Sequence, residues 1–302
     1  MPLLTIFTAP KPFTDPHVAT IQRNALKSWL SLGDQAEVLV IGDEPGLAEA
    51  AAEASVRQLA EGKRNAWGTP LISSIFSLAR QHSRSPYLCY ANADILFLPD
   101  LLEATRAVSS VRSQFVLIGQ RWDLEVREEL DFSSGWEARL AGKVRERGRL
   151  HPPAGSDYFI FPRDAYVDIP DFAVGRAGWD NWMISYAVKE GWAVVDGTLA
   201  VTAIHQNHDY SHLPGGTPHY DHEESEVNRA LAGGKANMYL VTDAGLRLVD
   251  GRLEPVQRGL AGWVRRAELW LTPAQVQPSG VRWFLARRLR RLRRRLSHSG
   301  VR

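Results

Sequence analysis

The stretch Tyr87–Asp100, YLCYANADILFLPD, sets two polar side chains between two runs of apolar residues. The runs at 87–91 and 95–98 are short and rich in aromatic and aliphatic residues, which predicts two buried strands. Asn92 and Asp94 stand between them, separated by one small residue. A buried carboxylate without a partner costs several kcal/mol. We therefore expect Asp94 to face a cation or a ligand.

The segments around this stretch alternate between strand-like and helix-like patterns. Strands are expected at 3–8, 36–42, 86–91 and 114–120, and helices at 15–33, 46–55, 69–83 and 101–113. Further along, strands are expected within 155–166, 193–198 and 201–204, with a helix that begins near Trp179. Strands that alternate with helices predict an α/β fold, with a mostly parallel central sheet and helices on both of its faces. In such sheets ligands bind beyond the carboxyl ends of the strands, where Asn92 and Asp94 stand.

Length and composition limit the class of protein. The chain has 302 residues, 44% apolar and 23% charged, so it can bury a substantial core. It has no run of about 18 apolar residues and no basic segment followed by an apolar one at its start, so neither a spanning helix nor a secretory signal is expected. The single Cys89 excludes an internal disulfide and favours a reducing compartment. A cytoplasmic location is expected, with Cys89 as a core thiol.

The chain is expected to divide into a catalytic domain over 1–235, an appendage with a hairpin and a linker over 236–280, and a basic tail over 281–302. The tail carries nine of the 36 basic residues and no acidic one, which leaves 27 basic against 34 acidic residues before it. One helical stripe of the tail is apolar, at Leu285, Leu289, Leu292 and Leu296. This pattern predicts a basic amphipathic helix that suits the anionic inner face of a membrane. A solvated terminus, or packing on a partner subunit, is the alternative. Nucleic-acid binding is not expected, because the body is acidic and no nucleic-acid motif occurs.

The spacing of Asn92 and Asp94 suits a hard divalent cation. Alternate side chains of a strand point to the same face. Mn²⁺ and Mg²⁺ prefer oxygen ligands and often take one or two from protein, with phosphate and water completing the shell. Asp94 can bind the metal directly, and Asn92 can offer a neutral oxygen to it or donate its amide to a ribose. No Gly-x-Gly-x-x-Gly follows the first strand and no Gly-Lys-Ser/Thr loop occurs, which disfavours dinucleotide and P-loop sites.

These features resemble the glycosyltransferases of the GT-A fold, within the nucleotide-diphospho-sugar transferase superfamily. Those enzymes carry a short Asp-x-Asp signature after a central strand, and NAD at 92–94 is similar to it, with Asn92 in the first position. The resemblance covers roughly residues 1–210 and is carried by TIFTAPKPF, GTPLISSIF, YANADI, GQRWD, GSDYF, GWDNWM and HQNHDYSH. This set is also similar to a little-characterised group of bacterial proteins classed with these transferases. The resemblance implies that Asp94 and Asn92 hold Mn²⁺ or Mg²⁺ on the diphosphate of a sugar nucleotide.

The resemblance also implies a catalytic base and a further metal ligand. Inverting members carry a carboxylate at a helix start, and Asp180 in GWDNWM matches that position. A base must lie within about 3 Å of the acceptor oxygen that it deprotonates. Helix capping is the alternative role of Asp180, and Asp157 in GSDYF is the rival base or a ligand of sugar hydroxyls. Many members place a His on a C-terminal loop as a metal ligand, which fits His205 or His208.

Other candidates for donor binding follow the ends of further strands or flank these motifs. They are Thr8, Ala9, Pro10, Lys11, Asp43, Asn65, Thr69, Ala93, Arg121, Trp122, Asp123 and Trp179. By resemblance, those that end the first two strands would contact the base and ribose, and those at 121–123 would lie near the sugar. For each of them, capping or core packing is the alternative role.

We therefore expect a metal-dependent glycosyltransferase that moves a hexosyl or pentosyl group from a nucleotide-diphosphate donor to a hydroxyl of a glycan or a lipid-linked acceptor. Inversion with Asp180 as base is expected, although a retaining route, which needs no dedicated base, stays open. A sugar-nucleotide nucleotidyltransferase is one alternative, but it would show a Gly-rich basic phosphate loop, and TAPKPFTDP is a poor match. A non-catalytic sugar-nucleotide-binding protein is the other.

Overall fold

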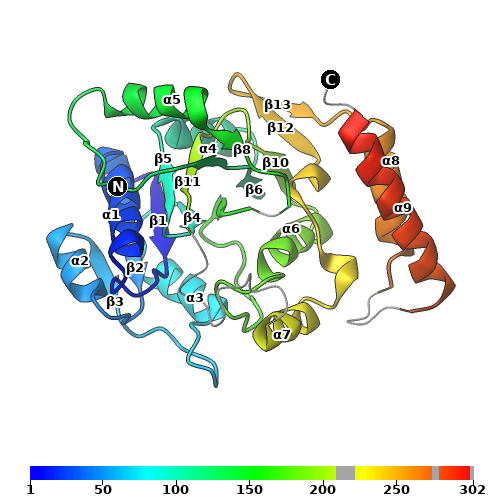
Figure 1. Cartoon of the computed structure of the whole chain (residues 1–302), viewed down its shortest axis with the longest axis horizontal. Helices are drawn as coiled ribbons and strands as arrows, with labels where there is room; N and C mark the ends of the chain where they lie inside the picture. Colours follow the sequence, from blue (N-terminus) through cyan, green and yellow to red (C-terminus); the bar gives the residue numbers. More distant parts are fainter. Residues whose placement is uncertain (155, 209–221, 274–278, 300–302) are drawn as a thin grey trace.

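The computed structural model describes residues 1–154, 156–208, 222–273 and 279–299 (Figure 1). Its largest element is a nine-stranded sheet with the order β13-β12-β10-β6-β9-β4-β1-β2-β3. These strands are β1 (Leu4–Thr8), β2 (Ala36–Ile41), β3 (Arg57–Leu59), β4 (Tyr87–Ala91), β6 (Phe115–Ile118), β9 (Tyr158–Pro162), β10 (Ala193–Asp196), β12 (Leu246–Val249) and β13 (Arg252–Pro255). β9 pairs antiparallel with β4 and β6, and β13 with β12, whereas the other pairs are parallel. The predicted α/β fold with a mostly parallel sheet is confirmed.

Helices flank this sheet. They are α1 (Pro16–Leu30), α2 (Leu47–Glu53), α3 (Ile72–His82), α4 (Asp100–Ser109), α6 (Trp179–Lys189) and α7 (Glu223–Leu231), with 3-10 turns at Gly33–Gln35, Lys235–Asn237 and Val241–Asp243. α1 begins where the sequence signals it, because the Asp15 carboxylate accepts a hydrogen bond from the backbone N–H of Val18 at 2.8 Å.

Two hydrophobic clusters lie on opposite faces of the sheet, because successive side chains of a strand point to opposite sides. In β4, Cys89 belongs to one cluster together with Trp29 of α1. Its neighbour Tyr90 belongs to the other, together with Phe76 of α3 and Met183 of α6. Burial on both faces explains why the central strands read as continuous apolar runs.

A second sheet of four strands positions the candidate site. Its strands lie in the order β5 (Ile95–Phe97), β11 (Ala203–Gln206), β7 (Trp122–Leu124) and β8 (Arg149–Leu150). α5 (Trp136–Arg147) covers it through a third cluster. In the register of this sheet, His205 pairs with Ile95 on one side and with Asp123 on the other. The sequence patterns predicted neither α5 nor the short strands β3 and β8.

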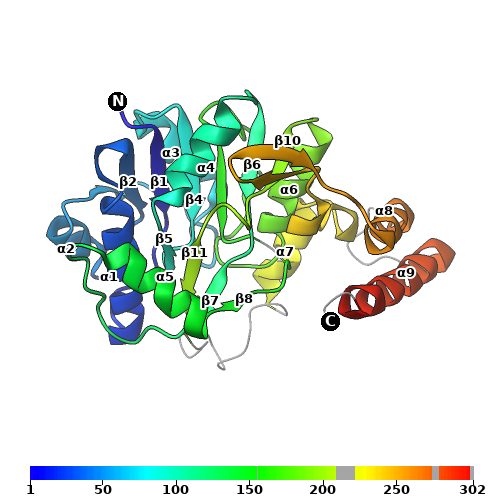
Figure 2. The same ribbon diagram turned by 90° about the horizontal axis from the view of Figure 1, so that it is seen from above.

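The C-terminal part begins with the hairpin expected within 236–256. This β12–β13 hairpin extends the central sheet beside β10. α8 (Leu260–Leu271) and α9 (Gly280–Ser299) follow and lie side by side at one end of the molecule (Figures 1 and 2). The buried carboxylate of Glu268 joins them, since it accepts hydrogen bonds from Arg290 at 2.7 Å and Arg293 at 3.0 Å. The division of the chain at 235 and 280 stays a prediction.

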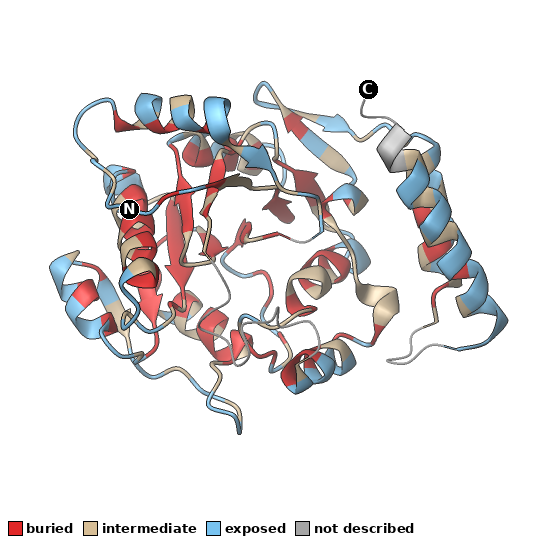
Figure 3. Cartoon of the chain, in the orientation of Figure 1, coloured by how far each residue is buried: buried red, intermediate tan, exposed pale blue. Residues whose placement is uncertain are grey.

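The core and these two helices differ in how far their residues are buried. The strands of the central sheet are mostly buried, whereas much of the outer surface of α8 and α9 is exposed (Figure 3). Among the described residues, no helix is both long and apolar enough to cross a membrane.

Candidate active site

Asp94, His205 and His208 converge at the carboxyl ends of β4 and β11. Nε2 of His208 lies 3.1 Å from Oδ2 of Asp94, and Nε2 of His205 lies 3.8 Å from the same oxygen. One ligand atom from each residue lies within 4.8 Å of the other two. Oδ1 of Asp94 is buried and has no hydrogen-bond partner among the described residues. An unpartnered carboxylate oxygen beside two imidazoles fits a divalent cation. Residues from 209 onward in the motif HQNHDYSH lie outside the described residues.

Buried hydrogen bonds fix the Asp94 loop against β11 and α1. The backbone N–H and the side-chain amide of Gln206 both donate to the carbonyl oxygen of Asp94 at 3.2 Å. The same amide donates to the carbonyl oxygen of Ile21 at 2.7 Å, and Asn24 donates to Oε1 of Gln206 at 3.0 Å. Gln206 and Asn24 are fully buried. The position of Asp94 is therefore set by its surroundings before any ligand binds.

Asp123 of β7 lies behind His205. Its Oδ1 is 3.5 Å from Nδ1 of His205 and accepts a hydrogen bond from Arg121 at 3.0 Å, while its Oδ2 lies 2.7 Å from Nδ1 of His151. Burial raises the pKa of Asp123, but His205, His151 and Arg121 outweigh it and hold the pKa well below its usual range. An ionised carboxylate behind an imidazole aims the opposite ring nitrogen at a metal. Asp123, expected near the sugar, thus lies beside His205 of the candidate cluster.

Lys11 adds a positive charge to the cluster. Its Nζ lies 3.4 Å from Nε2 of His208. Burial lowers the pKa of Lys11, and the charge of Asp94 opposes that change. Burial raises the pKa of Asp94, but His205, His208 and Lys11 outweigh it and hold the pKa well below its usual range. The surroundings thus favour the ionised form of the Asp94 carboxyl, which is the form that binds cations.

Asp157 forms a network with Asn92 and Arg121 beside the cluster. Its Oδ1 accepts hydrogen bonds from Arg121 at 2.7 Å and from the amide of Asn92 at 2.8 Å. The carbonyl oxygen of that amide accepts from the Tyr90 hydroxyl at 3.3 Å. Both the nitrogen and the oxygen of the Asn92 amide thus form hydrogen bonds with protein groups. The charge of Asp157 is already paired with a guanidinium, which suits a binding role better than the role of a base.

Asp180 occupies the first turn of α6. The N-cap residue is Gly178, whose φ of 108° favours glycine, so Asp180 lies inside the helix and is not its cap. Burial raises the pKa of Asp180 to about 6, the charge of Asp157 adds to the rise, and backbone hydrogen bonds from Asn181 and Gly178 limit it. A carboxyl group that titrates near neutral pH can accept and release a proton.

Tyr90, at the end of β4, lies within electrostatic reach of three acidic residues. Burial raises the pKa of its hydroxyl, and the charges of Asp94, Asp157 and Asp180 raise it further. The ring of Trp179 packs on Tyr90 with centroids 5.0 Å apart and is buried in the core. Trp179, expected to bind the donor, therefore supports the site from within the core.

The end of β1 and the end of β2 place further donor candidates. Thr8 has a buried hydroxyl with no hydrogen-bond partner among the described residues. Ala9 is partly buried and Pro10 is buried. Asp43 forms an ion pair with Arg64, and this guanidinium lowers the pKa of the exposed Asp43 carboxyl.

Asn65 and Thr69 belong to a network that ends on α7. Oδ1 of Asn65 accepts from the backbone N–H of Thr69 at 2.9 Å, and its amide donates to Glu224 at 2.7 Å. Glu224 also accepts from Arg176 at 2.7 Å. The network holds the loop before α3 against α7.

The remaining candidates lie near the cluster. Trp122 is partly buried against the third hydrophobic cluster, beside α5. Ala93 is partly buried between Asn92 and Asp94. Four residues of these networks were not expected from the sequence: Tyr90, His151, Gln206 and Glu224. Tyr90 read only as a strand residue and Gln206 as part of the His-rich loop, and the pairing of β7 with β8 and β11 is what brings His151 to Asp123.

Comparison with known proteins gives structural likeness alone. No protein-family model and no curated protein matches the sequence. One similar solved structure is the mannosyltransferase PcManGT from Pyrobaculum calidifontis in complex with GDP-Man and Mn²⁺, at 12% identity and a TM-score of 0.44, over 76% of this chain and 61% of that one. Another is glucosyl-3-phosphoglycerate synthase from Mycobacterium tuberculosis in complex with Mg²⁺ and UDP, at 15% identity and a TM-score of 0.47, over 78% and 80%. A third is S. aureus TarS 1-349, at 12% identity and a TM-score of 0.41, over 77% and 64%. At this level of similarity, the comparisons do not establish the function of the chain.

Proposed function

We propose that this chain is a metal-dependent glycosyltransferase that moves a sugar from a nucleotide-diphosphate donor to an acceptor hydroxyl. The observation that carries the proposal is the convergence of Asp94, His205 and His208, with Asp180 at the start of α6 near enough that both Asp94 and Asp180 act on the Tyr90 hydroxyl. A cation site and a carboxyl group that titrates near neutral pH supply the two needs of sugar transfer. One is stabilisation of the leaving group, and the other is deprotonation of the acceptor.

Mn²⁺ suits the proposed metal site better than Mg²⁺. Both cations prefer oxygen ligands, but Mg²⁺, the smaller and harder of the two, accepts a donor set with two imidazoles less readily. A cation held by Asp94, His205 and His208 would neutralise negative charge that develops on the leaving diphosphate. Lys11, beside His208, is placed to contact the same diphosphate. Asn92 becomes a further oxygen ligand if the contact with Tyr90 opens.

We assign the role of base to Asp180. In an inverting transfer the base takes the proton of the acceptor hydroxyl while that oxygen bonds to the anomeric carbon, and the diphosphate leaves with the bonding electrons. The raised pKa of Asp180 matches this role. Asp157, paired with Arg121, is proposed to bind substrate hydroxyls.

The nucleotide is proposed to bind along the ends of β1 and β2, over Thr8–Lys11 and near Asp43. The unpartnered hydroxyl of Thr8 supports this placement, because a buried polar atom without a partner is rare unless a ligand supplies one.

We further propose a glycan or lipid-linked acceptor and docking of α8 and α9 on the cytoplasmic face of a membrane. Aromatic side chains are exposed on both helices, and arginines lie over them, with Arg282 above Trp270 and Arg288 above Phe284. Exposed aromatic and basic groups on one helical unit are typical of binding to anionic lipid. Co-sedimentation with phosphatidylglycerol vesicles, and not with phosphatidylcholine vesicles, is the expected result. Trp270→Ser with Phe284→Ser should reduce it.

The first test of the proposed function is thermal-shift binding. UDP-, GDP-, CDP- and dTDP-sugars are added to the wild type, to Asp94→Ala and to a control, Asp34→Ala, which changes an exposed acidic residue outside the site. Each is measured with Mn²⁺ and with EDTA. One nucleotide class should raise the melting temperature of the wild type and of the control only with Mn²⁺, and Asp94→Ala should lose the effect. If a folded wild type responds to no donor, the proposal fails.

A further inference from the structure

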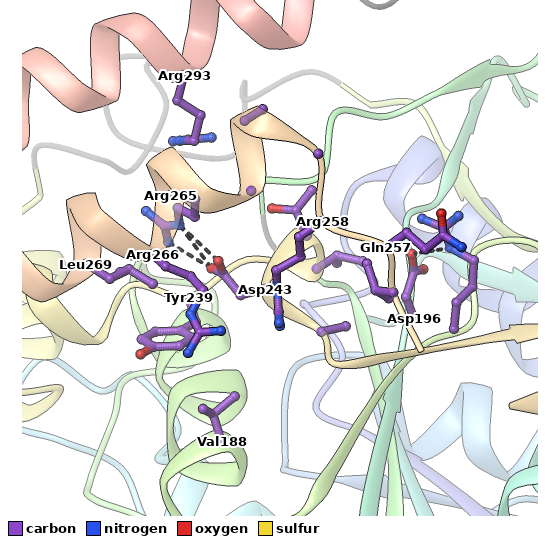
Figure 4. Close-up of a pocket in the computed structure, with 18 of the residues that line it drawn as sticks. Val188, Asp196, Tyr239, Asp243, Gln257, Arg258, Arg265, Arg266, Leu269 and Arg293 are labelled. Atoms are coloured by element: carbon purple, nitrogen blue, oxygen red, sulfur yellow. Dashed lines mark hydrogen bonds and ion pairs between the residues drawn. The ribbon is translucent and has the colours of Figure 1, made fainter. Parts of the chain in front are cut away.

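A cavity of about 670 Å³ lies outside the site described so far, between α8 and the body of the protein (Figure 4). α8 and the segment before it form one wall, and α6 and β10 contribute the opposite wall through Val188 and Asp196. The function proposed above makes no use of it. We call it the arginine cavity, because five arginines line it: Arg247, Arg258, Arg265, Arg266 and Arg293.

Three of these arginines already have carboxylate partners. Arg265 forms a buried ion pair with Asp243 at 2.8 Å, and Arg247 lies 3.5 Å from Asp196. Arg293 contacts Glu268 at 3.0 Å. Asp243 and Asp196 are the two acidic residues that line the cavity. These ion pairs account for three of the five arginines, and the charges of Arg258 and Arg266 remain.

Arg258 and Arg266 have no carboxylate within 4.0 Å among the described residues. Arg266 contacts a ring instead, with its guanidinium 5.7 Å from the centre of Trp263. In Figure 4 both side chains extend from α8 and the segment before it toward the space above Val188. Two guanidinium groups that line one cavity suit a doubly charged oxyanion, since each can donate two parallel hydrogen bonds to a phosphate group.

The arginine cavity is connected to the proposed active site through Gln120 and Tyr239, two of its lining residues. Gln120 lines the cavity and precedes Arg121, the partner of Asp157. Asn181, which follows Asp180, donates a hydrogen bond at 2.7 Å to the carbonyl oxygen of Tyr239, another lining residue. A molecule in the cavity therefore lies next to the segment that carries the proposed base.

From this geometry we infer that the arginine cavity binds a phosphate group of the acceptor, with Arg258 and Arg266 as its ligands. The inference rests on the proposed function and narrows the acceptor to a phosphate-bearing molecule. The phosphate is held by the two guanidinium groups, and the hydroxyl to be glycosylated extends toward Asp180. The phosphate belongs to a soluble phosphate ester or to a lipid headgroup, and the two sources are separated by experiment.

The first experiment measures binding of inorganic pyrophosphate by calorimetry in EDTA, so that no metal occupies the Asp94 site. The proteins are the wild type, the double variant Arg258→Gln with Arg266→Gln, and a control, Arg112→Gln with Arg252→Gln. The control removes two exposed arginines that do not line the cavity. We expect the double variant to bind at least ten-fold more weakly than the other two. Equal affinities in all three proteins, or no binding by the wild type, would overturn the inference.

A second experiment identifies the source of the phosphate. Glycerol phosphate represents a soluble ester, and vesicles with phosphatidic acid are compared with vesicles that carry phosphatidylglycerol at equal charge. Loss of glycerol phosphate binding in the double variant points to a soluble acceptor. Loss of a preference for phosphatidic acid points to a lipid headgroup. Equal loss on both vesicle types, with glycerol phosphate unaffected, means that only general charge was removed and contradicts the inference.

Donor binding separates this inference from the proposed function. The double variant should keep the Mn²⁺-dependent thermal shift with the donor nucleotide, because its two arginines lie outside the metal cluster. If pyrophosphate binding depends on Arg258 and Arg266 but no donor binds the wild type, the cavity is an anion site and the glycosyltransferase proposal fails alone.

Discussion

Replacing Asp180 with Asn should remove a pH-dependent loss of stability as well as activity. The pKa of Asp180 is about 6 in the folded chain, against 3.8 for an ordinary aspartate. The folded state therefore binds more protons than the unfolded state between these values. As a result, the wild type loses stability as the pH rises through them, and the loss is complete above the folded pKa.

The size of the effect follows from the two pKa values. A shift of one unit corresponds to about 1.4 kcal/mol, so the full loss is about 3 kcal/mol. Part of it falls at a pH too acidic for a convenient measurement. Between pH 5 and pH 8, the linkage relation leaves about 1.4 kcal/mol. Asn does not titrate, so the free energy of unfolding of Asp180→Asn relative to wild type should rise by that amount over this range. Among the described residues, Asp157 and Tyr90 are ionisable groups near Asp180, and of these only the charge of Asp157 adds to its raised pKa.

Urea unfolding at pH 5, 6, 7 and 8 measures this difference, with Asp168→Asn as a control at an exposed position. In the same variant the rate of sugar transfer should fall by about 10²- to 10⁴-fold, the usual contribution of a general base. Donor binding should persist. The wild-type rate should rise with pH through about 6, because the base must be ionised. A stability difference that is flat from pH 5 to pH 8, or an unchanged transfer rate, would refute the assignment.

Three further predictions concern the groups around the site and the C-terminal helices. Asp123→Asn should weaken Mn²⁺ binding by about 10- to 100-fold in a calorimetric titration, because the imidazole of His205 loses the group that orients it, and unchanged affinity would count against that role. Thr8→Val should keep or raise the melting temperature, since it removes a buried hydroxyl without a partner, yet it should weaken donor binding; a stability loss of more than about 1 kcal/mol would mean that the hydroxyl has a partner. Glu268→Ala should destabilise the contact between α8 and α9 by about 1.5–3 kcal/mol, because Arg290 and Arg293 of α9 lose their charged hydrogen-bond partner. Amide hydrogen exchange should then be faster in α9 and unchanged in β4. Equal protection of α9 in the variant and in the wild type would show that this contact does not hold α9 in place.

The central sheet could be predicted from the sequence because its strands are buried on both faces. An apolar run such as Phe115–Ile118 has one stable environment, between two layers of helices. Strand direction was not predictable in the same way. The run Tyr158–Pro162 reads equally well in either direction, and the structure places it antiparallel between β4 and β6. α5 carries a weaker signal, since only Trp136, Leu140 and Val144 give its highly charged sequence an apolar face.

Several residues of the candidate cluster could be named from the sequence, but their arrangement could not. Asp94, His205 and Asp180 follow from strand ends and from the family resemblance. That Asp123 lies behind His205 depends on the register of β7 with β11, which no spacing in the sequence encodes. That Asn92 binds Asp157 depends on the neighbouring strand β9. Long-range pairings of this kind decide which polar groups meet.

The cluster of Asp94, His205 and His208 joins segments that are 114 residues apart, since His208 meets Asp94 across the β5–β11 pairing. A cation bound there acts as a reversible cross-link between the first half of the chain and the strand that completes the small sheet. Loosening β11 from β5 would then release the ion, and loss of the ion would loosen β11. Because a ligand that binds only the folded state stabilises it in proportion to the logarithm of its concentration, the stability of this region should follow the supply of metal. The proposed enzyme would thus be most rigid when the metal that its activity requires is bound.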